Sequence, residues 1–189
     1  MNSPSHYIIN LAFLSQTITP KQNVAITIGA LLPDIPIFAF YFIAKYIYKL
    51  PDSKIWSEAY YEPLNQNITA LSHSIPLALI GAGICYYFNW QFGVALFASM
   101  VCHCLLDLPV HHDDAHRHFF PFSDYRFMSP FSYWDVKYHA KYIAGVELLM
   151  VLGSNPIVLN ILKSPVSKGI VVLIDLVYVF GYLRFYWLR

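Results

Sequence analysis

Five long apolar segments constrain the fold of this 189-residue chain more than any other feature of its sequence. The segments cover residues 23–49, 75–88, 92–108, 143–162 and 168–188, and polar or aromatic connections separate them. Hydrophobic residues make up 57% of the chain and charged residues 12%, about half the share that is usual in soluble domains. Apolar runs of this length are typical of membrane helices. We therefore expect an all-α, membrane-embedded helical bundle in which residues 1–189 form one domain.

Two helical hairpins are predicted from the connections between these segments. The polar, proline-containing turn Lys163–Lys168 joins the last two segments, each of which is about 20 residues long and can span a bilayer. A short polar turn also joins segments 75–88 and 92–108. His73 precedes the first arm of this hairpin and His103 lies near the end of the second. We therefore expect both histidines at the same end of the bundle.

The first apolar segment contains an interruption. Pro33 and Pro36 bracket Asp34, and proline removes backbone hydrogen bonds from a helix. If this segment crossed the membrane in a single pass, the chain would have to cross back through residues 50–72. That stretch is polar and contains no apolar segment. We therefore expect the first segment to be broken or re-entrant at Asp34, which is tolerated where irregular backbone lines a protein-covered cavity. The alternative is a bundle that lies on the membrane surface.

A possible metal site is indicated by polar residues inside the apolar segments. His103 and Asp107 are four residues apart, so a helix presents their imidazole and carboxylate on one face. Inserting an acidic residue at the bilayer centre costs about 2.5 to 3.5 kcal/mol of free energy, so such a residue needs a partner that stabilises its charge. With Asp34 and His73, the pair would supply a complete ligand set for Zn²⁺. The alternatives are hydrogen-bonded core histidines and a capping role for Asp107 before Pro109.

The connection 109–142 is long for a loop without a function, and it is rich in histidine. His112 and His116 are four residues apart and would share a face if this stretch were helical. They are therefore candidates for holding a second metal ion. The alternative is a solvated loop whose histidines titrate near neutral pH.

The same loop offers groups for catalysis and for substrate binding. Asp113, Asp114 and His118 are candidates for a general base. Arg117 and Arg126 could bind a phosphate or carboxylate group, because guanidinium pairs with either in bidentate fashion. The many aromatic residues of the loop fit an interface between acyl chains and water, where a lipid or another amphiphile is the natural substrate, although ordinary packing explains them equally well.

The order of these residues resembles that of a family of small bacterial inner-membrane proteins described as predicted metal-dependent hydrolases. The resemblance covers roughly the first 120 residues and rests on His6, Gly29–Asp34, Leu71–Ser74 and His103–Asp107. The order His, Asp, His, His-x-x-x-Asp, His is also similar to the ligand order of the zinc-dependent phospholipase C and P1 nuclease group, whose fold is a helical bundle enclosing a metal cluster.

This similarity implies a set of metal ligands. The first site would consist of Asp34, His73, His103 and Asp107, with His6 supporting a neighbouring ion and His112 or His116 a second one. The chain departs from the group after His139, because position 143 is Ile where the group has a glutamate. One or two ions are therefore expected rather than three.

Residues and resemblance together predict a membrane-bound hydrolase that cleaves a phosphoester or another ester of a lipid-like substrate with a Zn²⁺-activated water. The alternatives are a non-catalytic metal-binding membrane protein and a transporter or assembly factor that relays ions or protons. A net charge of +1 gives no electrostatic case for nucleic acid. The resemblance implies a multi-pass protein of the bacterial inner membrane, and the distribution of lysine and arginine favours a site that faces the cytoplasm.

Overall fold

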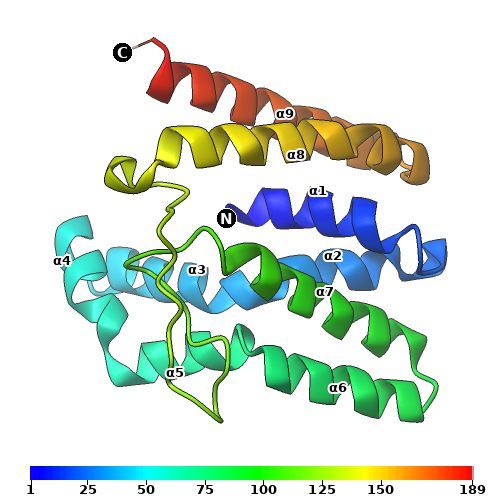
Figure 1. Cartoon of the computed structure of the whole chain (residues 1–189), viewed down its shortest axis with the longest axis horizontal. Helices are drawn as coiled ribbons and strands as arrows, with labels where there is room; N and C mark the ends of the chain where they lie inside the picture. Colours follow the sequence, from blue (N-terminus) through cyan, green and yellow to red (C-terminus); the bar gives the residue numbers. More distant parts are fainter. Residues whose placement is uncertain (189) are drawn as a thin grey trace.

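A computed structural model describes residues 1–188 of the chain as a bundle of helices (Figure 1). The described residues form no β-strand, so the predicted all-α fold class is confirmed. The helices are α1 (Ser3–Leu14), α2 (Asn23–Leu31), α3 (Ile35–Phe42), α4 (Asp52–Ser57), α5 (Pro63–Ser72), α6 (Ile75–Tyr87), α7 (Gln91–Asp107), α8 (Ala140–Ile161) and α9 (Pro165–Tyr186). Each predicted apolar segment therefore coincides with helix to within a few residues.

Three helical stretches are long and apolar enough to cross a membrane: Pro20–Ile47, Ala140–Ile161 and Pro165–Tyr186. Helices α5 and α6 would add a fourth crossing if they act as one span bent by 42°. Helix α7 has 17 residues and is about 25 Å long, short of a hydrocarbon core of about 30 Å. The α1–α2, α6–α7 and α8–α9 turns lie at one end of the bundle, and α4 and the long loop lie at the other (Figure 1).

The interruption of the first apolar segment is a 3₁₀ turn, Leu32–Asp34, between α2 and α3. Pro33 and Pro36 each lie at the first or second position of a helical element, where proline is tolerated because its missing N–H would have no partner anyway. The helix therefore continues through the break for 28 residues. The expected break at Asp34 is therefore present as a 3₁₀ turn, but the segment runs on past it and does not re-enter, so the re-entrant alternative is wrong. The larger bend lies instead between α5 and α6, at His73.

Helix α2 packs closely against α7, and Gly29 makes this approach possible. A Cβ atom at this position would lie 2.1 Å from the carbonyl oxygen of Leu96. The hydroxyl of Ser99 on α7 also donates to the carbonyl of Ile26 on α2 at 2.7 Å. This close packing places the end of α2 beside the face of α7 that carries His103.

Helices α8 and α9 form the predicted hairpin, and α8 also packs against α1 (Figure 1). The buried Glu147 of α8 connects the two regions, because its Oε1 accepts from the backbone N and the Nδ2 of Asn2, both at 3.0 Å. Ser5 and Tyr178 donate to the same oxygen. A carboxylate at a helix N-terminus is favourable because it faces the positive end of the helix dipole. Glu147 therefore fixes the start of α1, and with it the position of His6.

Candidate metal centre

Six largely buried side chains converge where α1, the α2–α3 turn, the α5–α6 junction, α7 and the long loop meet. They form three groups whose ligand atoms lie within 4.8 Å of one another: His6, His103 and Asp107; Asp34, His73 and His103; and His73, Asp107 and His116. Shared residues join the three groups into one, which we call the His/Asp cluster. Side chains more than a hundred positions apart in the sequence thus face a common point.

The carboxylate of Asp34 faces two imidazoles at a spacing that suits a metal ion. Its Oδ1 lies 3.5 Å from His73 Nε2 and 3.6 Å from His103 Nε2. These separations are long for hydrogen bonds. Two ligands on a tetrahedral Zn²⁺, with bonds of about 2.0 to 2.1 Å, are separated by about 3.4 Å. The Asp34 oxygen therefore lies at about the spacing of neighbouring zinc ligands from each of the two imidazole nitrogens.

The orientation of the two imidazoles is set by backbone carbonyls. The Nδ1 of His73 donates to the carbonyl of Thr69 at 3.0 Å, and the Nδ1 of His103 donates to the carbonyl of Ala30 at 2.8 Å. This arrangement places the proton on Nδ1 and leaves a lone pair on Nε2. Both Nε2 atoms are buried without a hydrogen bond of good geometry. Carbonyl support of this kind is what metal-binding histidines normally have.

Asp107 is the centre of the other two groups. Its Oδ1 lies 3.0 Å from His6 Nε2, 3.1 Å from His111 Nε2 and 2.7 Å from the amino nitrogen of Met1. Its Oδ2 lies 3.1 Å from His103 Nε2. Both oxygens of one carboxylate are therefore directed at imidazole nitrogens. Such a carboxylate can bridge two ions that lie about 3.5 to 4 Å apart.

Burial keeps several imidazoles of this region neutral. It lowers the pKa of His6 to about 4 and that of His118 to about 4. Burial also lowers the pKa of His116 well below its ordinary value, and the neighbouring His73 lowers it further. Only a neutral imidazole has a lone pair to offer a metal ion. The low pKa values of His6, His116 and His118 therefore favour metal binding at neutral pH. At His103 burial also lowers the pKa, but the facing carboxylates of Asp107 and Asp34 outweigh it and raise the pKa to about 10, so a metal ion bound there would displace a proton.

The loop histidines differ in where the structure places them. His116 joins the His/Asp cluster and stacks on His73 with ring centroids 4.0 Å apart. His118 donates from Nδ1 to the carbonyl of His73 at 3.1 Å and so lies behind that ligand. His112 lies outside the three groups, because its Nδ1 donates to the carbonyl of Ser129 and its ring stacks on Tyr138. The stretch 109–118 is not helical, which removes the spacing argument for His112.

The two candidate acids also differ. Asp114 Oδ2 lies 3.0 Å from His111 Nδ1 and accepts from the indole of Trp134 at 3.1 Å, while its Oδ1 is buried without a hydrogen-bond partner. Asp113 is largely exposed, with 56% of its side chain accessible. Of the two carboxylates, Asp114 is the one held in place by neighbours of the cluster.

Both candidate substrate-binding arginines already have partners within the protein. Arg117 donates to Asp124 at 2.8 Å. Arg126 donates to Gln66 at 2.6 Å and to the carbonyl of Ala115 at 2.7 Å. These contacts tie the loop to itself and to α5. They also hold both guanidinium groups against the protein, and the role of these groups in binding a substrate stays a prediction.

Sequence reasoning missed two neighbours of the ligands. His111 contacts Asp107, and the same spacing of four residues that singled out His103 and Asp107 could have pointed to it. The hydroxyl of Ser3 donates to the second oxygen of Asp34. No pattern in the sequence indicates this contact, because it depends on how α1 docks against the α2–α3 turn.

A cavity of about 650 Å³ opens beside the His/Asp cluster. Asp34, His111 and His116 line its polar side, and Asp113 and Asp114 lie at its wall. Aromatic residues make up much of the remainder, including Phe38, Trp56, Tyr60, Tyr61, Tyr133 and Trp134. A ligand in this cavity would contact the cluster directly.

No protein-family model, curated protein or solved structure matches this chain. The family resemblance noted in the sequence therefore stays a prediction. The geometry of the cluster supports the coarser statement that buried histidines and aspartates of a helical protein with candidate membrane spans could bind metal.

Proposed function

We propose that this protein is a membrane-bound hydrolase whose His/Asp cluster holds one or two divalent metal ions, Zn²⁺ being the best fit. Its substrate would be a phosphoester or another ester of a lipid-like molecule. The observation that carries the proposal is the position of the Asp34 carboxylate, 3.5 and 3.6 Å from two imidazole nitrogens that backbone carbonyls hold in the ligating orientation. The mixture of imidazole and carboxylate ligands suits zinc.

The cluster has enough ligands for a catalytic metal. A catalytic zinc site has three protein ligands with the fourth position open, and Asp34, His73 and His103 would supply such a set of three. A bound Zn²⁺ would supply Lewis acidity and lower the pKa of a coordinated water toward neutrality. A fourth protein ligand on the same ion would instead favour the non-catalytic alternative.

The chain's own residues would divide the remaining work. Asp114 lines the metal cavity and is held in place by His111 and Trp134, which suits a general base that orients a water. Asp113 lines the same cavity and is a second candidate. His118 would act through His73, whose backbone carbonyl accepts a hydrogen bond from the His118 Nδ1. Because Arg117 and Arg126 are engaged elsewhere, a negatively charged substrate group would be bound mainly at the metal.

The sidedness of the protein is part of the same proposal. The end of the bundle with the long loop carries Arg117, Arg126, Lys137 and Lys141, and the opposite turns carry Lys21, Lys163 and Lys168. The larger number of lysine and arginine residues on the loop side supports a cytoplasmic orientation of the site in a bacterial inner membrane.

The experiment compares metal content and hydrolysis in the full chain. Protein purified in detergent without added metal is analysed for zinc, stripped with a chelator and reloaded, and then assayed on a chromogenic phosphodiester and on a fluorescent phospholipid. Asp34→Asn removes the charged ligand with little change of shape, and Asp124→Asn is the matched control on an exposed loop residue. We expect wild type and Asp124→Asn to bind zinc and hydrolyse substrate, and Asp34→Asn to do neither. Wild type that binds no zinc, or hydrolysis that persists in Asp34→Asn, refutes the proposal.

A further inference from the structure

A second cavity, which we call the α8–α9 groove, lies against the membrane-spanning hairpin and has a volume of about 500 Å³. Its wall on α8 includes Ala144 and Leu148, and its wall on α9 includes Val177 and Phe185. The buried Glu147 also borders it, but donors from Asn2, Ser5 and Tyr178 already surround its Oε1. The groove is therefore predominantly apolar and aromatic.

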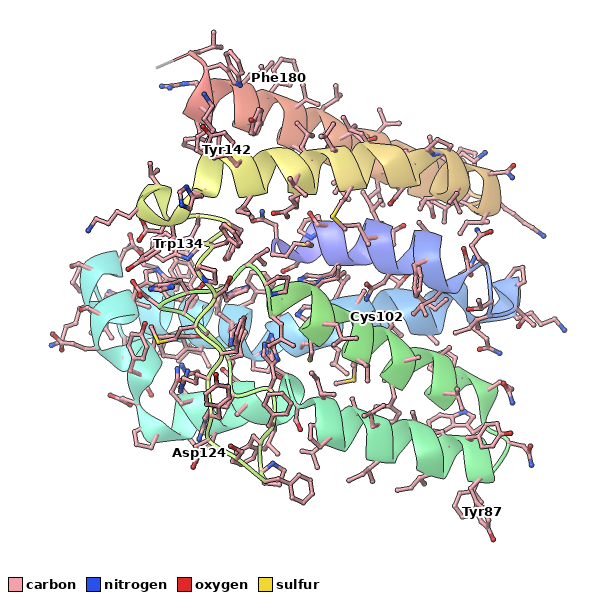
Figure 2. The ribbon with its side chains drawn as sticks, in the orientation of Figure 1. Tyr87, Cys102, Asp124, Trp134, Tyr142 and Phe180 are labelled. Atoms are coloured by element: carbon pink, nitrogen blue, oxygen red, sulfur yellow. The ribbon has the colours of Figure 1, made fainter. Side chains whose placement is uncertain are left out.

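The groove and the metal cavity share a wall. Asn2, Pro4, Tyr133 and Trp134 line both of them. Trp134 lies near the start of α8 (Figure 2), and its indole donates to Asp114 at 3.1 Å on the side of the metal cavity. One partition of two aromatic rings and the start of α1 therefore separates an apolar groove from a site with metal ligands.

The surroundings of the groove indicate what would fill it. Helices α8 and α9 are both candidate membrane spans, and only 6% of the apolar window of α9 is buried inside the protein. The surface that continues from the groove is therefore the surface that acyl chains of a bilayer would cover. Burial of alkyl groups against this lining is favourable at about 0.8 kcal/mol per CH₂.

We propose that the α8–α9 groove binds the alkyl chain of a membrane lipid while the polar group of the same molecule enters the metal cavity past Trp134. This inference rests on the proposed hydrolase function and names the substrate class as a bilayer amphiphile that enters sideways from the membrane. Tyr133 and Trp134 would lie at the junction between the chain and the polar group. The two unlike cavities match the two unlike halves of such a molecule.

The test uses the fluorescence of Trp134 and a lipid carrying a heavy-atom quencher. In the full chain, Trp56→Phe, Trp90→Phe and Trp187→Phe leave Trp134 as the only indole. The protein is reconstituted in phosphatidylcholine vesicles with or without bromine atoms in the middle of one acyl chain. Gly181→Phe fills the groove, since Gly181 lines it and a Cβ there meets nothing within 4 Å.

Gly169→Phe is the matched control, because Gly169 lies on the same helix with equally open surroundings and lines neither cavity. We expect brominated lipid to quench Trp134 in the background protein and in Gly169→Phe, and the quenching to be lost in Gly181→Phe. Equal quenching in the two variants, or none in either, overturns the groove proposal. Zinc content is measured on the same samples: we expect it to be retained in both variants, and its absence from every sample would overturn the proposed function independently of the quenching result.

Discussion

The helices and the long loop contribute to the His/Asp cluster in different ways. His6, His103 and Asp107 lie on helices, and Asp34 and His73 lie at helix junctions, and all five belong to the cluster. Of the seven polar residues that the sequence singled out in the loop, only His116 belongs to it. The rest support the loop, line the cavity or face solvent.

This difference shows what a rigid backbone adds to a polar side chain. Helix periodicity fixes which residues share a face, and the close packing of α2 on α7 fixes how two such faces meet. The loop has no such periodicity, so its side chains are placed by individual contacts, such as those of Arg126 with Gln66. The comparison predicts large effects on metal binding from helix substitutions and small ones from most loop substitutions.

The largest effect is expected for His103→Ala. His103 belongs to two of the three groups in the cluster, so its loss removes a ligand whichever of the two groups holds the ion. We expect zinc affinity to fall by more than the roughly 100-fold that loss of an outer hydrogen-bond partner can cause. Competition with a chromogenic zinc chelator measures the affinity. His112→Ala is the loop control and should leave it unchanged, and equal losses in the two variants would contradict the comparison.

The next effect tests the packing that brings the helices together. Gly29→Ala forces α2 away from the Leu96 carbonyl on α7. We expect a loss of about 1 to 3 kcal/mol in the free energy of unfolding, together with weaker zinc binding. Gly153→Ala on α8 is the control, since nothing lies within 4 Å of a Cβ there. Denaturant unfolding in detergent measures the free energy of unfolding of both variants, and competition with a zinc chelator measures their zinc affinity. A Gly29→Ala protein with unchanged stability and normal zinc affinity would refute this account of the packing.

A smaller effect is expected for Ser3→Ala. The Ser3 hydroxyl donates to the Asp34 oxygen that does not face the imidazoles, so its removal loosens a ligand without deleting it. We expect zinc affinity to fall by about 10-fold. Ser15→Ala, at the far end of α1, should have no effect on affinity. An unchanged affinity in Ser3→Ala would show that Asp34 needs no support from α1.

The smallest effect on the metal is expected for Arg126→Ala. This change removes two hydrogen bonds from a charged donor, which should weaken the attachment of the loop by about 2 kcal/mol. Limited proteolysis should then cut the loop faster, while zinc content stays at the wild-type level. Loss of zinc in this variant would show that the loop as a whole holds the cluster together.

The sequence allowed the helices and the helix-borne candidates to be predicted for physical reasons. Apolar length identifies a membrane helix, and the spacing of His103 and Asp107 follows from helix geometry. The continuation of the helical segment past Pro33 was not predicted. Proline within a segment usually indicates that a helix ends, but it is tolerated in the first turn of a helical element, which is where Pro33 lies. The contacts of Ser3 and Glu147 depend on the docking of α1, which no local pattern encodes.

The most direct test of the metal centre is X-ray absorption at the zinc edge on protein loaded with zinc. We predict nitrogen and oxygen neighbours at about 2.0 to 2.1 Å with the outer scattering of at least two imidazoles, and loss of this signature in Asp34→Asn. A spectrum with sulfur at about 2.3 Å, which would place Cys102 or Cys104 on the metal, or zinc that binds equally well without the Asp34 carboxylate, would contradict the account.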